Sequence, residues 1–293
     1  MTRFIAEIGS NHNRDRQRCM ELVDAAAMSG CTAVKLQIFR VENLFTGETL
    51  TRHPALGARC AWELPLELLE PIRERCTQHG LELGATPFAA WAVEAAADQV
   101  DFFKVASYDL LRHDLIEMCA ASGKPLVIST GMASMTEVDE AVAAANTTDL
   151  RLLHCVSGYP TPPDQANLAA IASLRERFGL PVGWSDHTRS EQVIRRAVLH
   201  WRASDVEVHI DLNGAGYEAG EHNWTCARLR PLIASLLAAE STQTPHGDDG
   251  AELDGDGVKH AMPVELADVA WRADPSDGLR PLRRVRLEAT AAR

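Results

Sequence analysis

Short apolar runs alternate with longer, more polar stretches over most of this chain. Eight of the runs are bounded by Gly, Pro or polar residues, and runs of this kind are typical of buried strands. The predicted strands are residues 4–7, 33–39, 81–86, 102–106, 126–129, 150–155, 181–185 and 206–211. The stretches between and after them are long enough for amphipathic helices, which we place at 16–29, 65–79, 90–99, 114–122, 136–145, 168–178, 191–202 and 224–239.

This regular alternation predicts a parallel sheet, because each helix returns the chain to the sheet in the same direction. Gly30, Gly80, Gly123 and Gly179 each end a helical stretch just before the next strand, as helix C-caps do. Eight strand–helix units predict closure into a (β/α)₈ barrel, or TIM barrel, over residues 1–240. The alternative is an open doubly wound sheet, but no glycine-rich dinucleotide fingerprint follows the first strand.

The sequence changes character after residue 240. Residues 241–262 are rich in Asp and Gly and lack periodicity, so we expect a flexible acidic loop there. A DGDG motif in this stretch resembles part of a calcium-binding loop, but the bidentate Glu that such a loop needs is missing. We expect residues 263–293 to pack back on the barrel as a short C-terminal extension that braces its surface.

Composition and charge narrow the class of protein. The 293 residues carry a formal net charge of −12, which argues against a nucleic-acid or anionic-membrane partner. No apolar run approaches the roughly 20 residues of a membrane span. A strand-like run begins at residue 4 and leaves no room for a signal peptide. Seven cysteines, without paired spacing, are typical of reduced thiols, so we expect a cytoplasmic protein.

Polar residues stand at the ends of the predicted strands, and a parallel barrel brings those ends to one face. Glu7 ends the first strand and is a candidate acid or base, unless Lys35 merely neutralises it. Later strands add two lysines, three hydroxyls and a glycine-bounded turn: Lys35, Thr86, Lys104, Ser107, Ser129 and Gly131. Compact cations, hydroxyl donors and accessible backbone amides are what a phosphate group needs. The strand ends therefore predict a phosphate site.

Two histidines, His187 and His209, stand at the ends of the last two strands. A single histidine on an apolar strand is more often a hydrogen-bonded core residue, but these two lie on neighbouring strands, close to Glu207 and Asp211. Imidazoles with carboxylates and water suit Mn²⁺, Fe²⁺, Co²⁺ or Zn²⁺. An incomplete protein shell leaves room for a substrate oxygen. The pattern predicts a divalent metal site with His187 and His209 as ligands and His222 as a candidate third.

Several motifs of the chain resemble those of one enzyme family. They are AEIGSNHN (6–13), VKLQ (34–37), ATPF (85–88), KPLVISTGM (124–132), LHC (153–155), YPTP (159–162) and SDHT (185–188). In this order they resemble the N-acetylneuraminate (sialic acid) synthase family. Members condense phosphoenolpyruvate with the open-chain aldehyde of an N-acetylated hexosamine on a (β/α)₈ barrel, using a divalent metal, commonly Mn²⁺ or Mg²⁺. The resemblance implies a metal-dependent synthase of a 3-deoxy-2-keto sugar acid of the nonulosonate type.

The resemblance also assigns roles to individual residues. It implies that Glu7, His187 and His209 are catalytic, Glu7 as acid/base group and the histidines as metal ligands. The phosphoenolpyruvate cradle that it implies consists of Lys35, Thr86, Lys104, Ser107, Ser129, Ser157 and Ser185. The residues that would complete the substrate site, toward the sugar and the first loop, are Gln37, Tyr159, Asn11 and His12. The expected partners are phosphoenolpyruvate and an aldose, and the family suggests a homodimer.

Two departures from the family pattern concern the acceptor sugar. The family usually carries a C-terminal antifreeze-like domain whose arginine reaches the sugar in the partner subunit, and we interpret this chain as a short form without it. A longer, glycine-rich loop at 214–224 replaces a Pro-Gly-Pro-Asp-His-like segment. We expect Arg272 or Arg280 to substitute for the missing arginine. The alternatives are another metal-dependent barrel lyase or aldolase that uses pyruvate, and a barrel that binds without catalysis.

Overall fold

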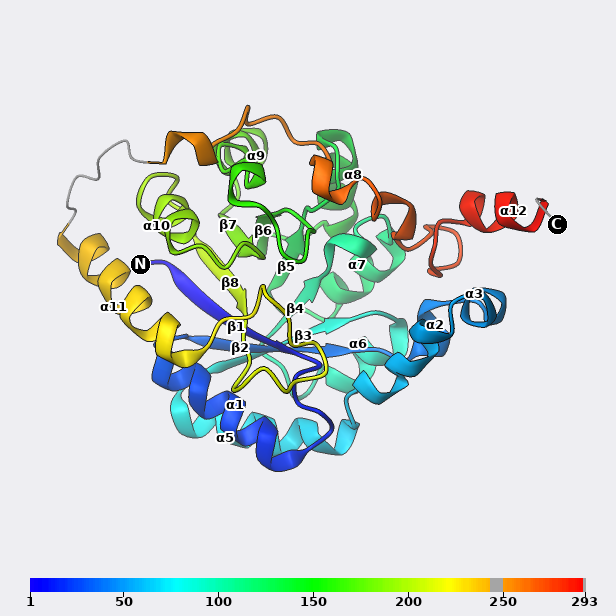
Figure 1. The fold of residues 1–293 in the computed structure, drawn as a ribbon, viewed down its shortest axis with the longest axis horizontal. Helices are drawn as coiled ribbons and strands as arrows, with labels where there is room; N and C mark the ends of the chain where they lie inside the picture. The colour runs from blue at the N-terminus through cyan, green and yellow to red at the C-terminus, as the bar shows by residue number, and fades with distance from the viewer. Residues whose placement is uncertain (243–249, 292–293) are drawn as a thin grey trace.

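The chain folds into a closed barrel of eight parallel strands, each followed by helical structure, in this computed structural model (Figure 1). The structure describes residues 1–242 and 250–291. Each strand pairs with the next along the chain, and the first pairs with the last, which confirms the predicted TIM barrel. The strands are β1 Arg3–Gly9, β2 Ala33–Ile38, β3 Glu82–Pro87, β4 Phe102–Val105, β5 Leu126–Ser129, β6 Leu150–Cys155, β7 Val182–Asp186 and β8 Asp205–His209.

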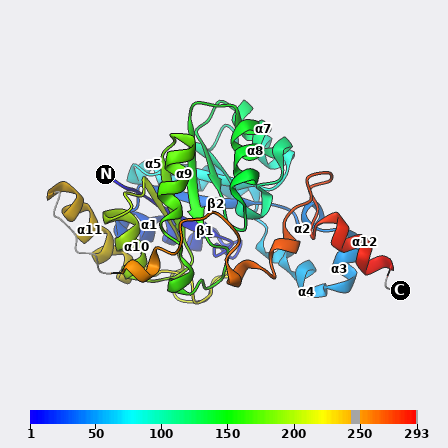
Figure 2. The same cartoon turned by 90° about the horizontal axis from the view of Figure 1, so that it is seen from above.

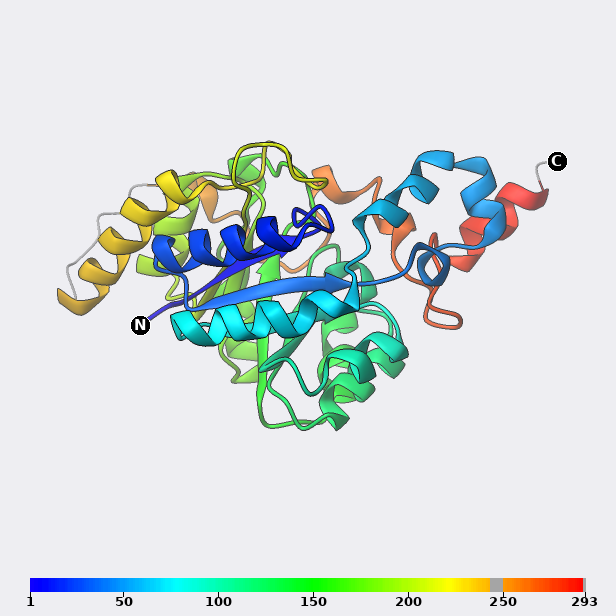
Figure 3. The same ribbon diagram turned by 90° about the horizontal axis from the view of Figure 1, so that it is seen from below.

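Helices surround the barrel, and they lie close to the predicted stretches. Those that match a prediction are α1 Arg16–Ser29, α5 Leu69–His79, α6 Ala90–Ala96, α7 His113–Ala121, α8 Met135–Ala145, α9 Ala170–Phe178, α10 Glu191–Leu199 and α11 Cys226–Thr242. Local signals fix several ends. Asp15 caps α1 by accepting from the Arg18 amide at 2.6 Å, and Gly30 ends the same helix with a left-handed φ of 88°. Figure 3 shows α1 alongside α5, on the outside of β1 and β2.

Strand side chains alternate between the barrel interior and the surrounding helices. The layer at the N-terminal ends of the strands is charged, and there Asp205 accepts from Arg3 at 3.4 Å and from Arg151 at 3.1 Å. The next layer is an apolar cluster of Ile5, Ala33, Phe102, Val127 and Leu153. Above it the interior becomes polar again. The barrel is therefore closed below by ion pairs and apolar packing, and only its upper end remains for chemistry.

One part of the fold was not predicted. The connection from β2 to α5 contains α2 Val41–Leu44, α3 Gly47–Arg52, α4 Pro54–Gly57 and the 3₁₀ segment Ala58–Trp62. These elements are too short to produce a clear helical period in the sequence. They form a projection at one end of the molecule together with the C-terminal helix α12, Arg283–Ala291 (Figures 1 and 2). The Arg52 guanidinium donates to the carbonyl oxygen of Ala289 at 3.0 Å, which joins α3 to α12.

The segment after α11 differs from the loose acidic loop that we expected. Residues 243–249 lie outside the described residues, but the rest of the stretch packs on the barrel. Leu253 is buried, and the Asp254 carboxylate accepts from Arg196 at 2.6 Å and from the Trp201 indole at 2.7 Å. Composition alone predicted disorder, because it carries no information on contacts with distant parts of the chain. Here those contacts are made with α10 and the turn that follows it, which lie far away in the sequence.

The remainder of the C-terminal segment runs across the ends of β4 to β6. The Ala273 amide donates to the Tyr108 carbonyl at 2.8 Å, and the Arg280 amide donates to that of Leu44 at 2.7 Å. This segment thus connects the barrel mouth to the projection. None of the described helices is long and apolar enough to cross a membrane.

Gly84 on β3 offers a test of the barrel packing. A Cβ added there would lie 2.2 Å from Cζ of Phe102, whose ring is buried inside the barrel. We expect Gly84→Ala to lower the free energy of unfolding by about 1–3 kcal/mol, as overpacking does. Urea denaturation measures this loss. Gly47→Ala, which meets open space, is the matched control. Adding Phe102→Leu to Gly84→Ala should restore part of the loss, and additive losses would contradict this account.

Candidate active site

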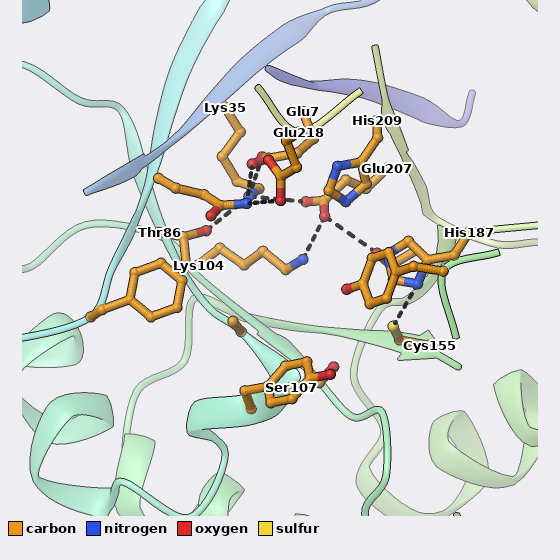
Figure 4. Close-up of a pocket in the computed structure, with 16 residues that line it drawn as sticks. Glu7, Lys35, Thr86, Lys104, Ser107, Cys155, His187, Glu207, His209 and Glu218 are labelled. Carbon is orange, nitrogen blue, oxygen red and sulfur yellow. Dashed lines mark hydrogen bonds and ion pairs between the residues drawn. The ribbon is translucent and has the colours of Figure 1, made fainter. Parts of the chain in front are cut away.

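The C-terminal ends of the strands surround a small, polar cavity (Figure 4). Its volume is about 60 Å³. Ten of the predicted site residues line it: Glu7, Lys35, Gln37, Thr86, Lys104, Ser107, Tyr159, Ser185, His187 and His209. The remaining lining residues are Phe88, Ala106, Tyr108, Cys155, Glu207 and Glu218. The parallel topology therefore brings together side chains that are spread over two hundred positions of the sequence.

This cavity is the inner of two cavities at the barrel mouth. Two lysine–glutamate ion pairs occupy its floor. Lys35 forms an ion pair with Glu7 and donates to the Thr86 hydroxyl at 2.8 Å. Lys104 donates to Glu207 Oε1 at 2.5 Å. All four charged side chains are at least nine-tenths buried. Figure 4 shows both ammonium groups pointing into the cavity toward the carboxylates. An anion that enters would meet two cations with little competing water, which strengthens their attraction for it.

The pKa values of the two glutamates are shifted in opposite directions. Burial raises the pKa of Glu7 to about 7, because Lys35 only partly offsets the cost of desolvation and the neighbouring Glu207 adds repulsion. Burial also opposes the charge of Glu207, but Lys104 and Lys35 together hold its pKa below the usual range. Carboxyls whose pKa values are pushed apart in this way are suited to separate roles. Glu7 can exchange a proton near neutral pH, and Glu207 remains an anion.

The two predicted metal ligands lie side by side above these charges. The ring centroids of His187 and His209 are 5.2 Å apart. His187 Nδ1 lies 2.8 Å from the Val156 carbonyl oxygen, which can only accept, so this nitrogen carries a proton and Nε2 is the nitrogen left to bind a metal. His209 Nδ1 is buried without a hydrogen-bond partner. Burial, with His187 and His222 nearby, holds the pKa of His209 well below its ordinary value, which keeps the ring neutral as a metal ligand must be.

The third candidate ligand, His222, lies in the rim of the site. Its ring centroid is 5.0 Å from that of His209 and 6.4 Å from that of His187. Within residues 1–242 and 250–291, no group of three or more His, Cys, Asp and Glu side chains is arranged to hold a metal. Burial opposes a charge on His187, but the neighbouring Cys155 raises its pKa, so this ring must lose its proton before it can bind a metal. Two imidazoles side by side nevertheless fit a cation whose other positions are filled by water or substrate.

Four predicted substrate residues do not line the inner cavity. Ser129 and Ser157 are buried at the ends of β5 and β6, where Ser129 Oγ has no hydrogen-bond partner. Asn11 accepts from the Glu218 amide at 2.9 Å and donates to the Ile210 carbonyl at 2.9 Å. His12 Nδ1 accepts from the Arg14 amide at 2.9 Å. In this structure Asn11 and His12 shape the loops at the mouth rather than face the cavity.

The backbone amides expected to hold phosphate are already hydrogen-bonded. The Gly131 amide donates to Ser107 Oγ at 2.9 Å, and the Met132 amide donates to the carboxylate of Glu265 at 2.8 Å. The sequence could not reveal this, because Glu265 lies in the C-terminal segment, far along the chain. The expectation that these amides are accessible was therefore wrong, and the cations and hydroxyls remain as the anion-binding groups.

Two acidic residues were missing from the predicted substrate set. Glu207 stands two positions before His209 on β8, so strand alternation could have placed its side chain on the same interior face. Glu218 reaches the cavity from the glycine-rich loop, where its carboxylate accepts from the Ser10 amide at 3.0 Å and from Gln37 at 3.5 Å. No periodic signal exists in such a loop, and only the folded structure reveals this contact.

A larger outer cavity opens onto the inner one. Its volume is about 560 Å³, and the two cavities share Gln37, Phe88, Ala106, Tyr108, Tyr159 and Glu218. Its other walls come from three segments outside the barrel repeat. The β2–α5 connection supplies Phe45, Leu56, Arg59 and Trp62; the β8–α11 loop supplies Tyr217, Ala219 and His222; and the C-terminal segment supplies Asp268, Trp271 and Arg280.

The two arginines proposed for the acceptor have different positions. Arg280 lines the outer cavity, with its guanidinium 5.2 Å from the Phe88 ring centroid and paired with Asp109. Arg272 is buried and donates to Glu137 at 2.8 Å, and it lines neither the inner nor the outer cavity. Arg280 is therefore the arginine that remains a candidate for contacting the acceptor sugar.

Comparisons with known proteins converge on one family. The model of the NeuB family matches residues 22–244. An uncharacterized protein of Methanocaldococcus jannaschii is 37% identical over 64% of this chain and 56% of its own length. The N,N'-diacetyllegionaminic acid synthase of Campylobacter jejuni is 28% identical over 92% of this chain and 82% of its own length. The crystal structure of an N-acetylneuraminic acid synthetase from Leptospira borgpetersenii superposes with a TM-score of 0.77 at 27% identity, covering 86% and 90% of the two chains.

The pair of Lys104 and Glu207 generates a prediction about stability. Lys104→Met leaves the buried Glu207 with the more distant Lys35, at 3.8 Å, as its lysine partner. We expect the free energy of unfolding at pH 8 to fall by about 3 kcal/mol, the cost of an incompletely paired buried charge. At pH 5 the loss should be smaller, because Glu207 without Lys104 takes up a proton more readily. Urea denaturation at both pH values measures this, and Lys104→Met/Glu207→Gln should recover part of the loss. Equal losses at the two pH values would refute the explanation.

Proposed function

Since this chain belongs to the NeuB family, we propose that it condenses phosphoenolpyruvate with an aldose, forming a 3-deoxy-2-keto sugar acid of the nonulosonate type and free phosphate. The observation that carries the proposal is the pair of buried lysines at the mouth, each held by a carboxylate. Burying four charges is costly. Lys35 and Lys104 therefore support a site that takes a compact, multiply charged anion such as phosphoenolpyruvate.

The inner cavity is proposed to hold phosphoenolpyruvate. Lys35 and Lys104 would bind its phosphate and carboxylate, and the hydroxyls of Thr86, Ser107 and Ser185 would donate hydrogen bonds. Ser129 and Ser157 belong to the same cradle through their positions at adjoining strand ends.

The outer cavity is proposed to hold the acceptor aldose, an N-acetylmannosamine-like sugar or a relative. Gln37, Tyr159 and Glu218 line both cavities, so they would lie where the aldehyde meets C3 of phosphoenolpyruvate. Arg280 is proposed to contact the acceptor from the C-terminal segment. Positioning two reactants in this way can supply about 7–11 kcal/mol of a barrel enzyme's rate enhancement.

The histidines are proposed to hold a divalent cation. His187 and His209 offer one imidazole nitrogen each, with His222 as a further candidate, and Mn²⁺ or Mg²⁺ is the proposed ion, with Co²⁺ or Zn²⁺ as alternatives. When bound, such an ion supplies Lewis acidity that polarises the aldehyde of the acceptor. The contact of the tilted Tyr159 ring with His187, with ring centroids 4.1 Å apart, would fix the imidazole that faces it.

The proposed reaction balances in atoms and protons. The C2–C3 double bond of phosphoenolpyruvate supplies the electron pair that forms a bond from C3 to the aldehyde carbon. Water adds to the electron-poor C2 and gives one proton to Glu7, which passes it to the aldehyde oxygen. The resulting tetrahedral C2 collapses to a ketone as its bond to the phosphate oxygen breaks, and the remaining proton of the added water leaves with phosphate. Glu7 can both take and give a proton because its pKa lies near 7.

Two alternatives predict different behaviour. A metal-dependent lyase or aldolase using pyruvate has no phosphate to bind, so Lys35 and Lys104 would be dispensable for substrate affinity. A non-catalytic barrel would bind phosphoenolpyruvate without releasing phosphate. The buried pair of Lys35 and Lys104 favours the synthase over the lyase or aldolase, and the proton-exchanging environment of Glu7 favours it over a non-catalytic barrel. We further propose a cytoplasmic location, in accord with seven cysteines that form no disulfide, and homodimeric association by analogy with the family.

The direct test is phosphate release from phosphoenolpyruvate with Mn²⁺ across a panel of aldoses, beginning with N-acetylmannosamine and its 6-phosphate. We expect release together with a product three carbons longer than the acceptor, identified by mass. His187→Ala should lose Mn²⁺ binding, measured by calorimetry, together with turnover, while its circular dichroism stays unchanged. Phosphoenolpyruvate binding without release from any aldose would favour the non-catalytic barrel, and full activity of His187→Ala would exclude the assigned metal site.

The pKa of Glu7 generates a prediction about pH. As the base that accepts a proton from water, Glu7 must be ionised, so kcat/KM should fall as the pH drops through about 7. Glu7→Gln should lower kcat by about 10²–10⁴ and remove this limb of the profile. Glu7→Asp is the matched control, because it keeps a carboxyl and should retain a pH-dependent limb. A rate that rises as the pH drops would show instead that Glu7 acts first as an acid.

A further inference from the structure

A buried carboxylate from the C-terminal segment joins two turns at the barrel mouth. Glu265 is fully buried. Its Oε1 accepts from the Met132 amide at 2.8 Å and from the Ser157 amide at 2.6 Å, and its Oε2 accepts from the Met262 amide at 2.8 Å. Met132 follows β5 and Ser157 follows β6. One side chain therefore binds the ends of two adjacent strands to the segment that crosses over them.

The turn that Glu265 holds after β5 has little freedom to move. Met132 is buried and has a left-handed φ of 60°, a conformation that costs a non-glycine residue free energy unless its surroundings impose it. Gly131 lies so close to its neighbours that a Cβ there would be 2.2 Å from Ser157 Oγ and 2.8 Å from Ser107 Oγ. The Met132 hydrogen bond to Glu265 lies directly beside this close approach.

These contacts connect Glu265 to the hydroxyls of the inner cavity. The Gly131 amide donates to Ser107 Oγ at 2.9 Å, and Ser107 lines the cavity. Ser157 stands two residues before Tyr159, which lines both cavities. A shift of either turn would therefore move Ser107 or Tyr159. Glu265 itself lines neither cavity, so any effect on substrate must pass through the turns.

The charge of Glu265 also requires an explanation, since a buried carboxylate is costly without partners. Three backbone amides satisfy it, and the buried Lys259 of the same segment is a nearby cation: burial lowers the pKa of Lys259, and Glu265 acts against that shift. Hydrogen bonds from N–H groups to a carboxylate are stronger than those to a neutral acceptor, so Glu265 is suited to hold the Met132 and Ser157 amides firmly.

We propose that Glu265 is a positioning residue for phosphoenolpyruvate: it holds the turns after β5 and β6 so that Ser107, Ser157 and Tyr159 face the bound substrate. This inference rests on the proposed function for the identity of the substrate. It makes the C-terminal segment a part of the binding site, although that segment contributes no side chain to the inner cavity.

A merely structural role would make Glu265 one more anchor of the C-terminal segment, and the chain provides a control for that. Asp254 anchors the same segment through Arg196 and Trp201, away from the strand ends. Glu265→Gln keeps the size and one carbonyl acceptor, but it replaces one oxygen by an amide group that cannot accept from a backbone N–H. Asp254→Asn makes the equivalent change at the other anchor.

The experiment compares the full-length wild type, Glu265→Gln and Asp254→Asn. We expect Glu265→Gln to raise the KM for phosphoenolpyruvate roughly tenfold, as expected for loss of a charge-assisted hydrogen bond, with kcat changed less than the KM. Asp254→Asn should lower the melting temperature and leave that KM within about twofold. Hydrogen exchange should be faster in peptides containing Met132 and Ser157 in Glu265→Gln alone.

The outcomes separate the two proposals. Equal KM values for Glu265→Gln and wild type, or equal increases in both variants, would overturn the positioning role and leave the proposed function intact. A wild type that neither binds phosphoenolpyruvate nor releases phosphate would overturn the proposed function, and the inference with it. If Glu265→Gln does not fold, Glu265→Asp, which keeps the charge on a shorter side chain, should show the same rise in KM; an unchanged KM there would count against the proposal.

Discussion

The rest of the structure depends on the two ion pairs at the mouth, between Lys35 and Glu7 and between Lys104 and Glu207. Four charges in so small a volume are tolerable only if each cation meets its carboxylate, and that requirement fixes the strands. Glu7 and Lys35 are direct register partners on β1 and β2. A slip of either strand by one residue would turn its charged side chain toward the apolar layer under the helices and leave the partner's charge unpaired. Register is therefore enforced by charge inside the barrel as well as by apolar packing outside it.

The same ion pairs account for the chemistry that the site can perform. A cavity whose cations are already matched by carboxylates is neutral enough to fold, yet those carboxylates can give way to a stronger anion. The two carboxylates respond differently when an anion displaces them, because Glu207 lies between two lysines and Glu7 is held by only one. The pattern of charge therefore separates a group that exchanges a proton from one that only balances charge.

Much of this arrangement could be predicted from the sequence, and the rest could not for physical reasons. The eight strands and their helices follow from apolar periodicity, and Lys35, Lys104, His187 and His209 follow from their places at strand ends. Short helices such as α3 lack the length to establish a period. Glu218 and Glu265 make their contacts across more than a hundred residues of sequence, so only folding brings them to the mouth.

The outer cavity places the choice of acceptor on a different part of the chain from the chemistry. Its distinctive walls come from the β2–α5 connection, the β8–α11 loop and the C-terminal segment, none of which belongs to the eightfold repeat. Insertions, deletions or exchanges in these three segments can reshape the acceptor chamber while the lysines, glutamates and histidines keep their register. Evolution or protein engineering could thus change the acceptor specificity of the same barrel by exchanging its peripheral segments and leaving its strands unchanged.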